Sequence, residues 1–399
     1  MEQAELTALL TPQGLRMVDE VGPLASTTEV AAAVSRLRAA GHSPDLVSAV
    51  VGQAHLRVRA AAKFGPFADR MLFTRAGLEQ ATRLEVAARH AGRFRDAGVQ
   101  RVADLGCGIG GDALGLAGLG LDVLAVDADE TTAALAAYNL APFGEAVTIR
   151  SGLAEETDLD GWDAVWLDPA RRTAGHSETS RTRPEDWSPS LEWAFALAER
   201  MPVGIKLGPG LDRDLIPEGV EAQWISVDGS TVELVLWSGS LRREGVRRSA
   251  LVIRGGSAAE LAAPADSPDE PVRELGAFLH EPEGAVIRAR LIGEVARDLH
   301  AGMVADGIAY LTSDAALTNP FVQSFRVREV LPVKVPAINA ALQANGIGTV
   351  EIKKRGVDVD PAQFRRKLTL RGDASATLIL TRLGEGPKAK RVAVLADRV

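Results

Sequence analysis

Hydrophobic positions are spaced differently in three parts of the chain, and the first part predicts helices. Up to about residue 92 the sequence is rich in Ala, Leu, Glu and Arg and lacks two-residue alternation. We expect helices at residues 13–20, 28–40, 44–63 and 74–97. Thr27 and Thr74 are the expected N-caps of two of them, and Gly41 and Gly65 mark breaks. Residues 1–92 are therefore predicted to form an N-terminal helical domain.

In the second part, short apolar runs alternate with helical stretches. The runs that predict strands lie at residues 101–105, 122–126, 146–150, 164–167, 203–206, 222–227 and 232–237. The predicted helices between them lie at residues 111–118, 129–140 and 191–201. This alternation predicts a Rossmann-like α/β domain with a seven-stranded, largely parallel sheet at residues 93–256. Asp228-Gly229-Ser230 separates the last two strands and predicts a hairpin turn.

The third part, residues 273–399, predicts a smaller α+β domain of the ferredoxin-like type. Residues 257–272 before it are rich in Ala, Pro and acidic residues, as in a linker or an exposed crossing. Apolar runs at 285–287 and 308–311 flank a predicted helix at 289–300. Further extended segments and helices are predicted at 324–334, 336–344, 348–353, 361–368 and 376–382.

A glycine cluster lies between a predicted strand and a predicted helix, in VADLGCGIGGDALGLA at residues 102–117. Gly106, Gly108, Gly110 and Gly111 allow the backbone to turn sharply and to approach a ligand closely. The next predicted strand leads to Asp127, 21 residues after Gly106, which is about the spacing of a carboxylate that binds ribose hydroxyls. The sequence therefore predicts a site for an adenosine-containing cofactor; the alternative is a tight turn that binds no ligand.

Two acidic strand ends indicate which cofactor this is. The same glycines also satisfy the GxGxxG spacing of nicotinamide and flavin dinucleotide sites. Asp104, however, suits the ammonium group of S-adenosylmethionine and would be badly placed beside a pyrophosphate. A later buried strand ends at Asp168-Pro169 in WDAVWLDPARR, which resembles motif IV of the class I methyltransferases. We therefore expect S-adenosylmethionine as the cofactor.

Composition indicates the cellular compartment of the protein and the kinds of site it can contain. The chain has 399 residues, 46% of them hydrophobic. It has no run of about 18 apolar residues, so we expect no membrane span. The start MEQAELTALL lacks the basic region of a signal peptide. The single cysteine, Cys107, excludes an intramolecular disulfide and a cysteine zinc site. We expect a cytoplasmic protein without a metal, in which Cys107 is a small buried residue rather than a nucleophile.

Charge is unevenly distributed along the chain, although the net charge is −8. Residues 321–399 contain 15 Lys and Arg against 7 Asp and Glu, a net charge of +8, and the other residues carry −16. The basic residues gather in IKKRG at 352–356, RRKLTLRG at 365–372 and KAKR at 388–391. A basic domain on an acidic body predicts a polyanionic partner.

Four segments together give the chain a family resemblance: VADLGCGIGGDALGLA, WLDPARR, IKLGPGLD and EIKKRGVDVDPAQFRRKLTL. With them it resembles a bacterial class I S-adenosylmethionine-dependent methyltransferase with a C-terminal THUMP-like domain. Because THUMP domains bind RNA, the resemblance implies a structured RNA substrate, tRNA or rRNA. The residues that it places at the cofactor are Asp104, Gly106, Gly108, Asp127, Gly152 and Leu153.

The resemblance also implies that Asp168 and Pro169 present the methyl acceptor. In the amino-methyltransferases of this class, a second proline and an aromatic residue that stacks on the base follow them. Here Ala170 and Arg171 take those places, so the stacking ring is missing. Arg171 or Arg172 is a candidate for binding a phosphate or for stacking, with a surface salt bridge as the alternative.

Other polar residues are weaker candidates. His176 is either a proton acceptor or a solvated loop residue, and Gln80 and Thr82 either touch the methionine end of the cofactor or line a polar helix face. The candidate RNA contacts of the basic region, which are otherwise solvated, are Lys353, Lys354, Arg365 and Arg366.

Two other functions stay open. The chain could act as a methyltransferase on a protein or a small molecule, with the basic region serving stability or assembly. It could also bind the cofactor and RNA without catalysis, although the three intact acids Asp104, Asp127 and Asp168 argue against this.

Overall fold

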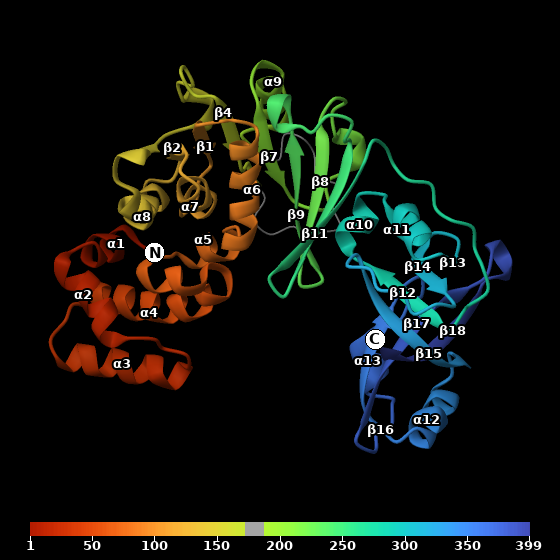
Figure 1. Cartoon of the computed structure of the whole chain (residues 1–399). Coiled ribbons are helices and arrows are strands. Elements are labelled where there is room, and N and C mark those ends of the chain that lie inside the picture. The colour runs from red at the N-terminus through yellow and green to blue at the C-terminus, as the bar shows by residue number, and fades with distance from the viewer. Residues whose placement is uncertain (172–186) are drawn as a thin grey trace. The chain divides into compact units, whose positions relative to one another are not determined.

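The computed structural model describes residues 1–171 and 187–399, and of Arg171 it describes the backbone alone (Figure 1). These residues form two compact units. Unit 1 comprises Met1–Leu207, Leu211–Val220 and Leu236–Arg242. Unit 2 comprises Gly208–Gly210, Glu221–Val235 and Arg243–Val399.

Unit 1 begins with helices, drawn in red and orange in Figure 1: α1 (Gln3–Leu9), α2 (Pro12–Val21), α3 (Thr27–Ala39) and α4 (Pro44–Phe64). The last three were predicted, whereas α1 was not. The predicted N-cap Thr27 is wrong, because Ser26 caps α3. The Ser26 hydroxyl accepts the Glu29 N–H at 3.2 Å, and the Glu29 carboxylate accepts the Ser26 N–H at 2.8 Å. This reciprocal capping box satisfies two N–H groups that have no partner within the helix.

The single helix predicted at 74–97 is two helices, α5 (Arg75–Gln80) and α6 (Leu84–Asp96), as the chain leaves the helical conformation at Ala81. The Lys63 ammonium donates to the carbonyls of Leu78, Glu79 and Ala81 at 2.8, 2.7 and 2.7 Å. These carbonyls would otherwise need partners in a further helical turn. Burial, followed by the nearby cations Arg83 and Lys206, lowers the pKa of Lys63 to about 8. The break between the two helices contains Thr82, which is buried.

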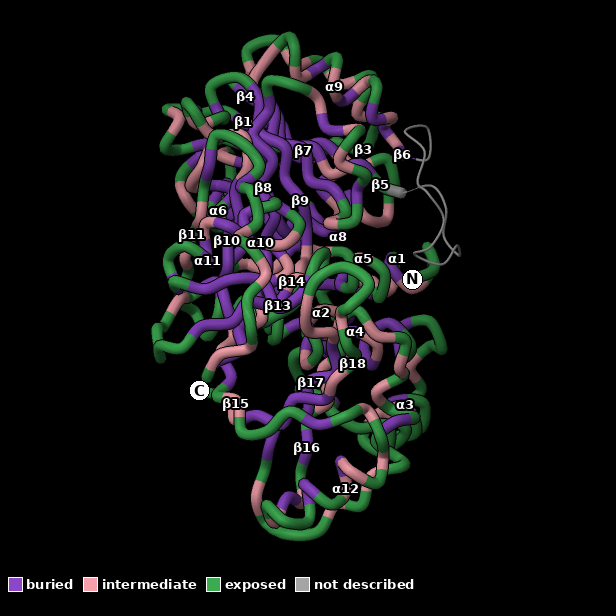
Figure 2. Tube along the Cα trace, turned by 90° about the vertical axis from the view of Figure 1, so that its right-hand side faces the viewer, coloured by how far each residue is buried: buried purple, intermediate pink, exposed green. Residues whose placement is uncertain are grey.

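A parallel sheet forms the centre of unit 1. Its strands, in spatial order, are β7 (Val203–Leu207), β4 (Ala164–Leu167), β1 (Arg101–Leu105), β2 (Asp122–Asp127) and β3 (Val147–Ser151). Figure 2 shows β1, β4 and β7 as buried. The helices of this region are α7 (Gly111–Gly118), α8 (Glu130–Leu140) and α9 (Leu191–Arg200). The strand order changes direction between β1 and β4, since β2 and β3 follow on one side of β1, and β4 and β7 lie on the other. Open α/β sheets bind ligands at such a point, at the carboxyl ends of the strands.

The sheet continues beyond these strands, in the order β11-β10-β8-β9-β7-β4-β1-β2-β3. The added strands are β8 (Glu221–Val227), β9 (Ser230–Trp237), β10 (Arg248–Arg254) and β11 (Ser257–Ala263). Asp228 and Gly229, with φ of 47° and 83°, make the predicted hairpin turn between β8 and β9.

All seven predicted strands are present, but the sheet has nine, because β10 and β11 were not predicted. The linker expected at 257–272 is wrong over residues 257–263. They form the edge strand β11, which pairs with β10 and is mostly exposed; four of its seven residues are alanine, which has low strand propensity.

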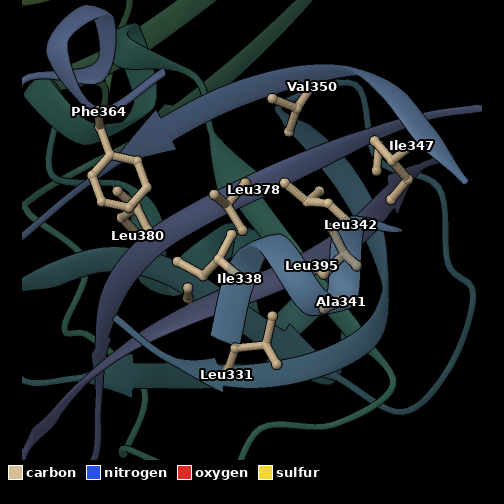
Figure 3. Packing of buried hydrophobic residues seen from close by; sticks show 12 residues of the cluster. Leu331, Ile338, Ala341, Leu342, Ile347, Val350, Phe364, Leu378, Leu380 and Leu395 are labelled. Carbon is tan, nitrogen blue, oxygen red and sulfur yellow. The ribbon is translucent and has the colours of Figure 1, made fainter. Parts of the chain in front are cut away.

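The C-terminal part of unit 2 has a mixed sheet in the order β13-β14-β12-β15-β18-β17-β16. The strands are β12 (Phe278–Pro282), β13 (Gly302–Ala305), β14 (Ile308–Ser313), β15 (Val322–Pro332), β16 (Ile347–Lys354), β17 (Ala374–Leu383) and β18 (Lys390–Arg398). The helices are α10 (Gly284–Arg288), α11 (Ile292–Asp298), α12 (Val335–Ala344) and α13 (Pro361–Arg365). Figure 3 shows Ile338 and Leu342 of α12 packed among Leu378 and Leu395 of the sheet.

The prediction was incomplete in this region. The apolar run at 285–287 lies in α10, and the helix predicted at 289–300 is the shorter α11. Strands β12, β13 and β18 were not predicted, and β18 begins inside the basic stretch KAKR. Lysine and arginine have low strand propensity, so that stretch reads as a loop until its pairing with β15 and β17 is known.

Candidate active site

The glycine turn after β1 lies against the segment that follows β4. Gly106 has φ of 84°, and the N–H groups of Gly106 and Cys107 donate to the Val126 carbonyl at 2.8 and 3.0 Å. A Cβ atom at Gly106 would lie 2.6 Å from the Asp168 carbonyl oxygen. Only glycine therefore allows this approach, which brings the ends of β1 and β4 together. Cys107 is buried, as expected.

Asp104, near the end of β1, carries a fully buried carboxylate that has no hydrogen-bond partner among the described residues. Burial, followed by the neighbouring carboxylates of Asp112 and Asp168, raises its pKa well above the usual range. A buried carboxylate without a partner is costly and fits a site that receives a cationic or hydrogen-bonding group from a ligand.

Asp127 ends β2 and is oriented by backbone amides. One carboxylate oxygen accepts the Gly108 N–H at 2.9 Å and the other accepts the Asp129 N–H at 3.0 Å. Each oxygen keeps a second lone pair for a ligand hydroxyl. Burial raises the pKa of Asp127. The Gly152 N–H donates to the Asp127 carbonyl at 3.0 Å, and the next residue, Leu153, exposes 47% of its surface. The structure thus places an apolar side chain one residue beyond a contact of Asp127.

Lys206 of β7 is a site residue that sequence reasoning missed. Its side chain is buried, and its Nζ atom lies 2.5 Å from Oδ2 of Asp168 and 3.6 Å from Oδ2 of Asp112. It also donates to the Thr82 hydroxyl at 2.9 Å. The one signal in the sequence was a lysine inside an otherwise apolar strand, VGIKL. Such a lysine is seldom buried unless it is paired.

Asp112, the second residue of α7, links Lys206 to α6. Its carboxylate accepts from the Thr82 hydroxyl at 2.7 Å and from Nδ1 of His90 at 2.8 Å. Burial alone would raise the pKa of Asp112, but Lys206, His90 and Thr82 together hold it below the usual range. Thr82 thus contacts both Asp112 and Lys206, whereas Gln80 is exposed at the end of α5.

Asp168 is partly accessible, with 32% of its side chain exposed, and Pro169 is buried. The backbone of Ala170–Arg171 forms β5, which pairs with β6 (Trp187–Ser188). Arg172 and His176 lie outside the described residues.

The four basic candidates of unit 2 differ in their surroundings. Lys353 is 2.6 Å from Oε2 of Glu281, and Arg365 donates to the Val350 carbonyl at 2.5 Å. Lys354 and Arg366 are exposed. Two of the four basic side chains are thus engaged in internal contacts of unit 2.

Neither a metal site nor a membrane span is present in the described part of the chain. Residues 1–171 and 187–399 contain no group of three or more His, Cys, Asp or Glu side chains that could hold a metal ion. In the same residues, no helix is long and apolar enough to cross a membrane.

Comparison with known proteins identifies relatives of this chain. A THUMP domain-like family matches residues 322–398, and a domain of unknown function matches residues 2–60. A protein of two Mycobacterium tuberculosis strains, named an uncharacterized S-adenosylmethionine-dependent methyltransferase, is 33% identical over 362 residues. That match covers 88% of this chain and 96% of the relative.

A crystal structure has a similar fold. It is that of a candidate methyltransferase from Porphyromonas gingivalis W83, with a TM-score of 0.70 and 18% identity. The similarity covers 94% of this chain and all of that one. Together with the relative at 33% identity, these findings show that the chain belongs to the S-adenosylmethionine-dependent methyltransferases, uses S-adenosylmethionine rather than a dinucleotide, and has a C-terminal THUMP-like domain.

Proposed function

We propose that this methyltransferase modifies a nucleotide of structured RNA, tRNA or rRNA. The observation that carries the proposal is the THUMP-like match at residues 322–398, because domains of that type bind RNA. The excess of basic residues in the same part of the chain supports a polyanionic substrate. We assign the phosphate contacts to the exposed Lys354 and Arg366 rather than to Lys353 and Arg365, which are engaged within unit 2.

The residues around the glycine turn fit S-adenosylmethionine. The unpartnered Asp104 carboxylate would receive the ammonium group, with the Gly106 and Gly108 backbone close to the cofactor. Asp127, which Gly108 and Asp129 hold by their amides, would accept the ribose hydroxyls. At the following strand end, Gly152 and Leu153 would hold the adenine by backbone and apolar contacts.

Bound S-adenosylmethionine supplies a methyl group on a sulfonium, which is already a good electrophile. The residues of the chain then need to hold the acceptor in line and to exclude water. Asp168 is accessible enough to accept a hydrogen bond from an acceptor amine and to stabilise the positive charge that develops on it. Pro169 would offer its backbone carbonyl. No strong general base is required for such an acceptor.

The test is methyl transfer by Asp168→Ala. We expect S-adenosylhomocysteine affinity to stay within about twofold, while turnover falls by about 10²-fold or more, as when one transition-state hydrogen bond is removed. The assay measures radiolabelled methyl transfer to total RNA from a strain that lacks the gene, and calorimetry measures affinity. Asp160→Ala is the control, because that exposed acid lies just upstream of β4 and should leave turnover unchanged.

One observation supports a different substrate. Because Lys353 and Arg365 make internal contacts, part of the basic stretches stabilises unit 2 instead of facing a partner. If wild-type enzyme transfers no methyl group to RNA from the deletion strain, the acceptor must be sought among proteins and small molecules. We place the reaction in the cytoplasm, because a chain with a single cysteine cannot form the intramolecular disulfides that are typical of proteins in oxidising compartments.

A further inference from the structure

A chain of polar contacts joins four elements of unit 1 and ends at Asp168. It runs from His90 on α6 to Asp112 on α7, then to Lys206 on β7 and to Asp168 beyond β4. Thr82 bridges Asp112 and Lys206. We infer that Lys206 is a positioning residue of the methyl-transfer site, which fixes the orientation of the Asp168 carboxylate through its ammonium group. The inference rests on the proposed role of Asp168.

The direction of each hydrogen bond in this chain follows from its chemistry. An ammonium group only donates, so the Thr82 hydroxyl accepts from Lys206 and donates its own proton to Asp112. The pKa of Asp112 is held below its usual range, so its carboxylate accepts and Nδ1 of His90 donates. Each of these hydrogen bonds therefore has only one possible direction. At the end of the chain, the Lys206 ammonium is the donor and the Asp168 carboxylate is the acceptor.

Lys206 is itself held in place. Its side chain is 11% exposed, and Thr82 and Asp112 limit where its Nζ atom can go. Asp168, in contrast, has 32% of its side chain exposed, so burial alone does not select its rotamer. An ion pair of 2.5 Å to a fixed donor selects one of them before any acceptor arrives.

Lys206 could instead serve only to neutralise Asp112 in the interior. The experiment therefore compares Lys206→Met, Asp112→Asn and the double variant, all in the full chain. Lys206→Met leaves the buried Asp112 carboxylate with one cation fewer, so it should lower the melting temperature. The double variant removes both charges and should restore the melting temperature toward that of wild type. Under the positioning role, turnover on RNA from the deletion strain falls by about 10²-fold in both variants that lack Lys206. Affinity for S-adenosylhomocysteine stays within a few fold, because the proposed cofactor contacts are elsewhere.

Arg57→Met is the matched control. Arg57 is also buried in unit 1, and it donates to Asp19 and to the Met71 carbonyl, away from this network. It should lower the melting temperature without lowering turnover. Recovery of turnover together with melting temperature in the double variant would overturn the inference.

A second readout needs no substrate. In protein labelled with carboxyl-13C aspartate, the Asp168 resonance is assigned with Asp168→Asn and followed against pH. Removing a cation at 2.5 Å makes a carboxylate easier to protonate, so this resonance should titrate at a higher pH in Lys206→Met than in wild type. Equal titration curves would contradict the inference. Wild-type protein that leaves RNA unmethylated would contradict the proposed function alone, and the resonance would still test whether Lys206 pairs with Asp168 in solution.

Discussion

At the scale of single residues, the buried carboxylate of Asp104 lowers the stability of the folded protein at neutral pH. Its carboxylate is buried without a partner, and burial and neighbouring acids raise its pKa. An unfolded aspartate ionises near pH 4, so between that pH and the raised native value the folded state alone keeps the proton. Asp104 thus makes its full contribution to stability below pH 4, and that contribution is lost as pH rises through the native pKa.

The loss of this stability contribution at higher pH leads to a prediction. Asp104→Asn should raise the melting temperature of the free protein at pH 8, because the isosteric amide has no charge to desolvate. The same change should weaken S-adenosylmethionine binding by roughly 1.5–3 kcal/mol, the scale of a charged hydrogen bond. Calorimetric melting and titration at pH 8 measure the two effects.

A melt at acid pH is the control for that prediction. Near pH 4 and below, the wild-type carboxyl is protonated, so the two proteins should melt at similar temperatures. If Asp104→Asn melts at a lower temperature than wild type at pH 8, the proposed cost of burying the Asp104 carboxylate is contradicted. If it binds the cofactor as tightly as wild type, the proposed contact of Asp104 with the cofactor is contradicted.

At the scale of elements, close backbone approach builds the site. The turn after β1 and the segment after β4 meet at Gly106, where a Cβ atom would overlap the Asp168 carbonyl. Helices α6 and α7 meet in a similar way, since a Cβ atom at Gly115 would lie 2.8 Å from the Ala87 backbone. The packing of α6 on α7 places His90 against Asp112.

Gly106→Ala should therefore lower the free energy of unfolding and weaken cofactor binding. A left-handed alanine alone costs about 1–2 kcal/mol, and the overlap with the Asp168 carbonyl adds to this. Urea denaturation measures the first effect and titration with S-adenosylhomocysteine the second. Gly118→Ala, at the end of α7 with open space around it, is the control and should be neutral or slightly stabilising. Equal stability of the two variants would show that the two segments are not packed as described.

At the scale of the whole molecule, the proposed cofactor residues all belong to unit 1 and the basic candidates to unit 2. The positive charge lies in one part of unit 2, since residues 321–399 carry +8 and all other residues of the chain together carry −16. Binding of the cofactor and of a polyanion should therefore respond to different substitutions.

The double variant Lys354→Glu with Arg366→Glu tests this separation. RNA affinity should fall, and the dependence of log affinity on log salt should flatten by about 0.7 to 0.9 for each phosphate that the variant no longer binds. Filter binding to unfractionated tRNA at several salt concentrations measures both, and S-adenosylhomocysteine affinity should not change. Lys353→Gln is the control: it breaks the ion pair with Glu281 and should leave the salt slope nearly unaltered. A double variant with wild-type affinity and slope would exclude these residues from an RNA interface.

The five strands of the parallel sheet in unit 1, the glycine turn and the acidic strand ends could all be predicted from the sequence. These features depend on local properties: hydrophobic periodicity, backbone freedom at Gly106 and the position of Asp104, Asp127 and Asp168 after apolar runs. The edge strand β11 was missed, because its exposed, alanine-rich sequence has no strand pattern of its own and only its pairing with β10 identifies it.

The contacts of the polar side chains, in contrast, depend on how distant segments pack. Thr82, His90, Asp112, Asp168 and Lys206 are far apart in the sequence and meet because β1, β4 and β7 are adjacent strands and α6 packs on α7. Burial can be expected from composition along a strand, but the partner of a buried charge depends on which strands become neighbours. For that reason the sequence could not predict that Lys206 pairs with Asp168 or that Lys353 pairs with Glu281.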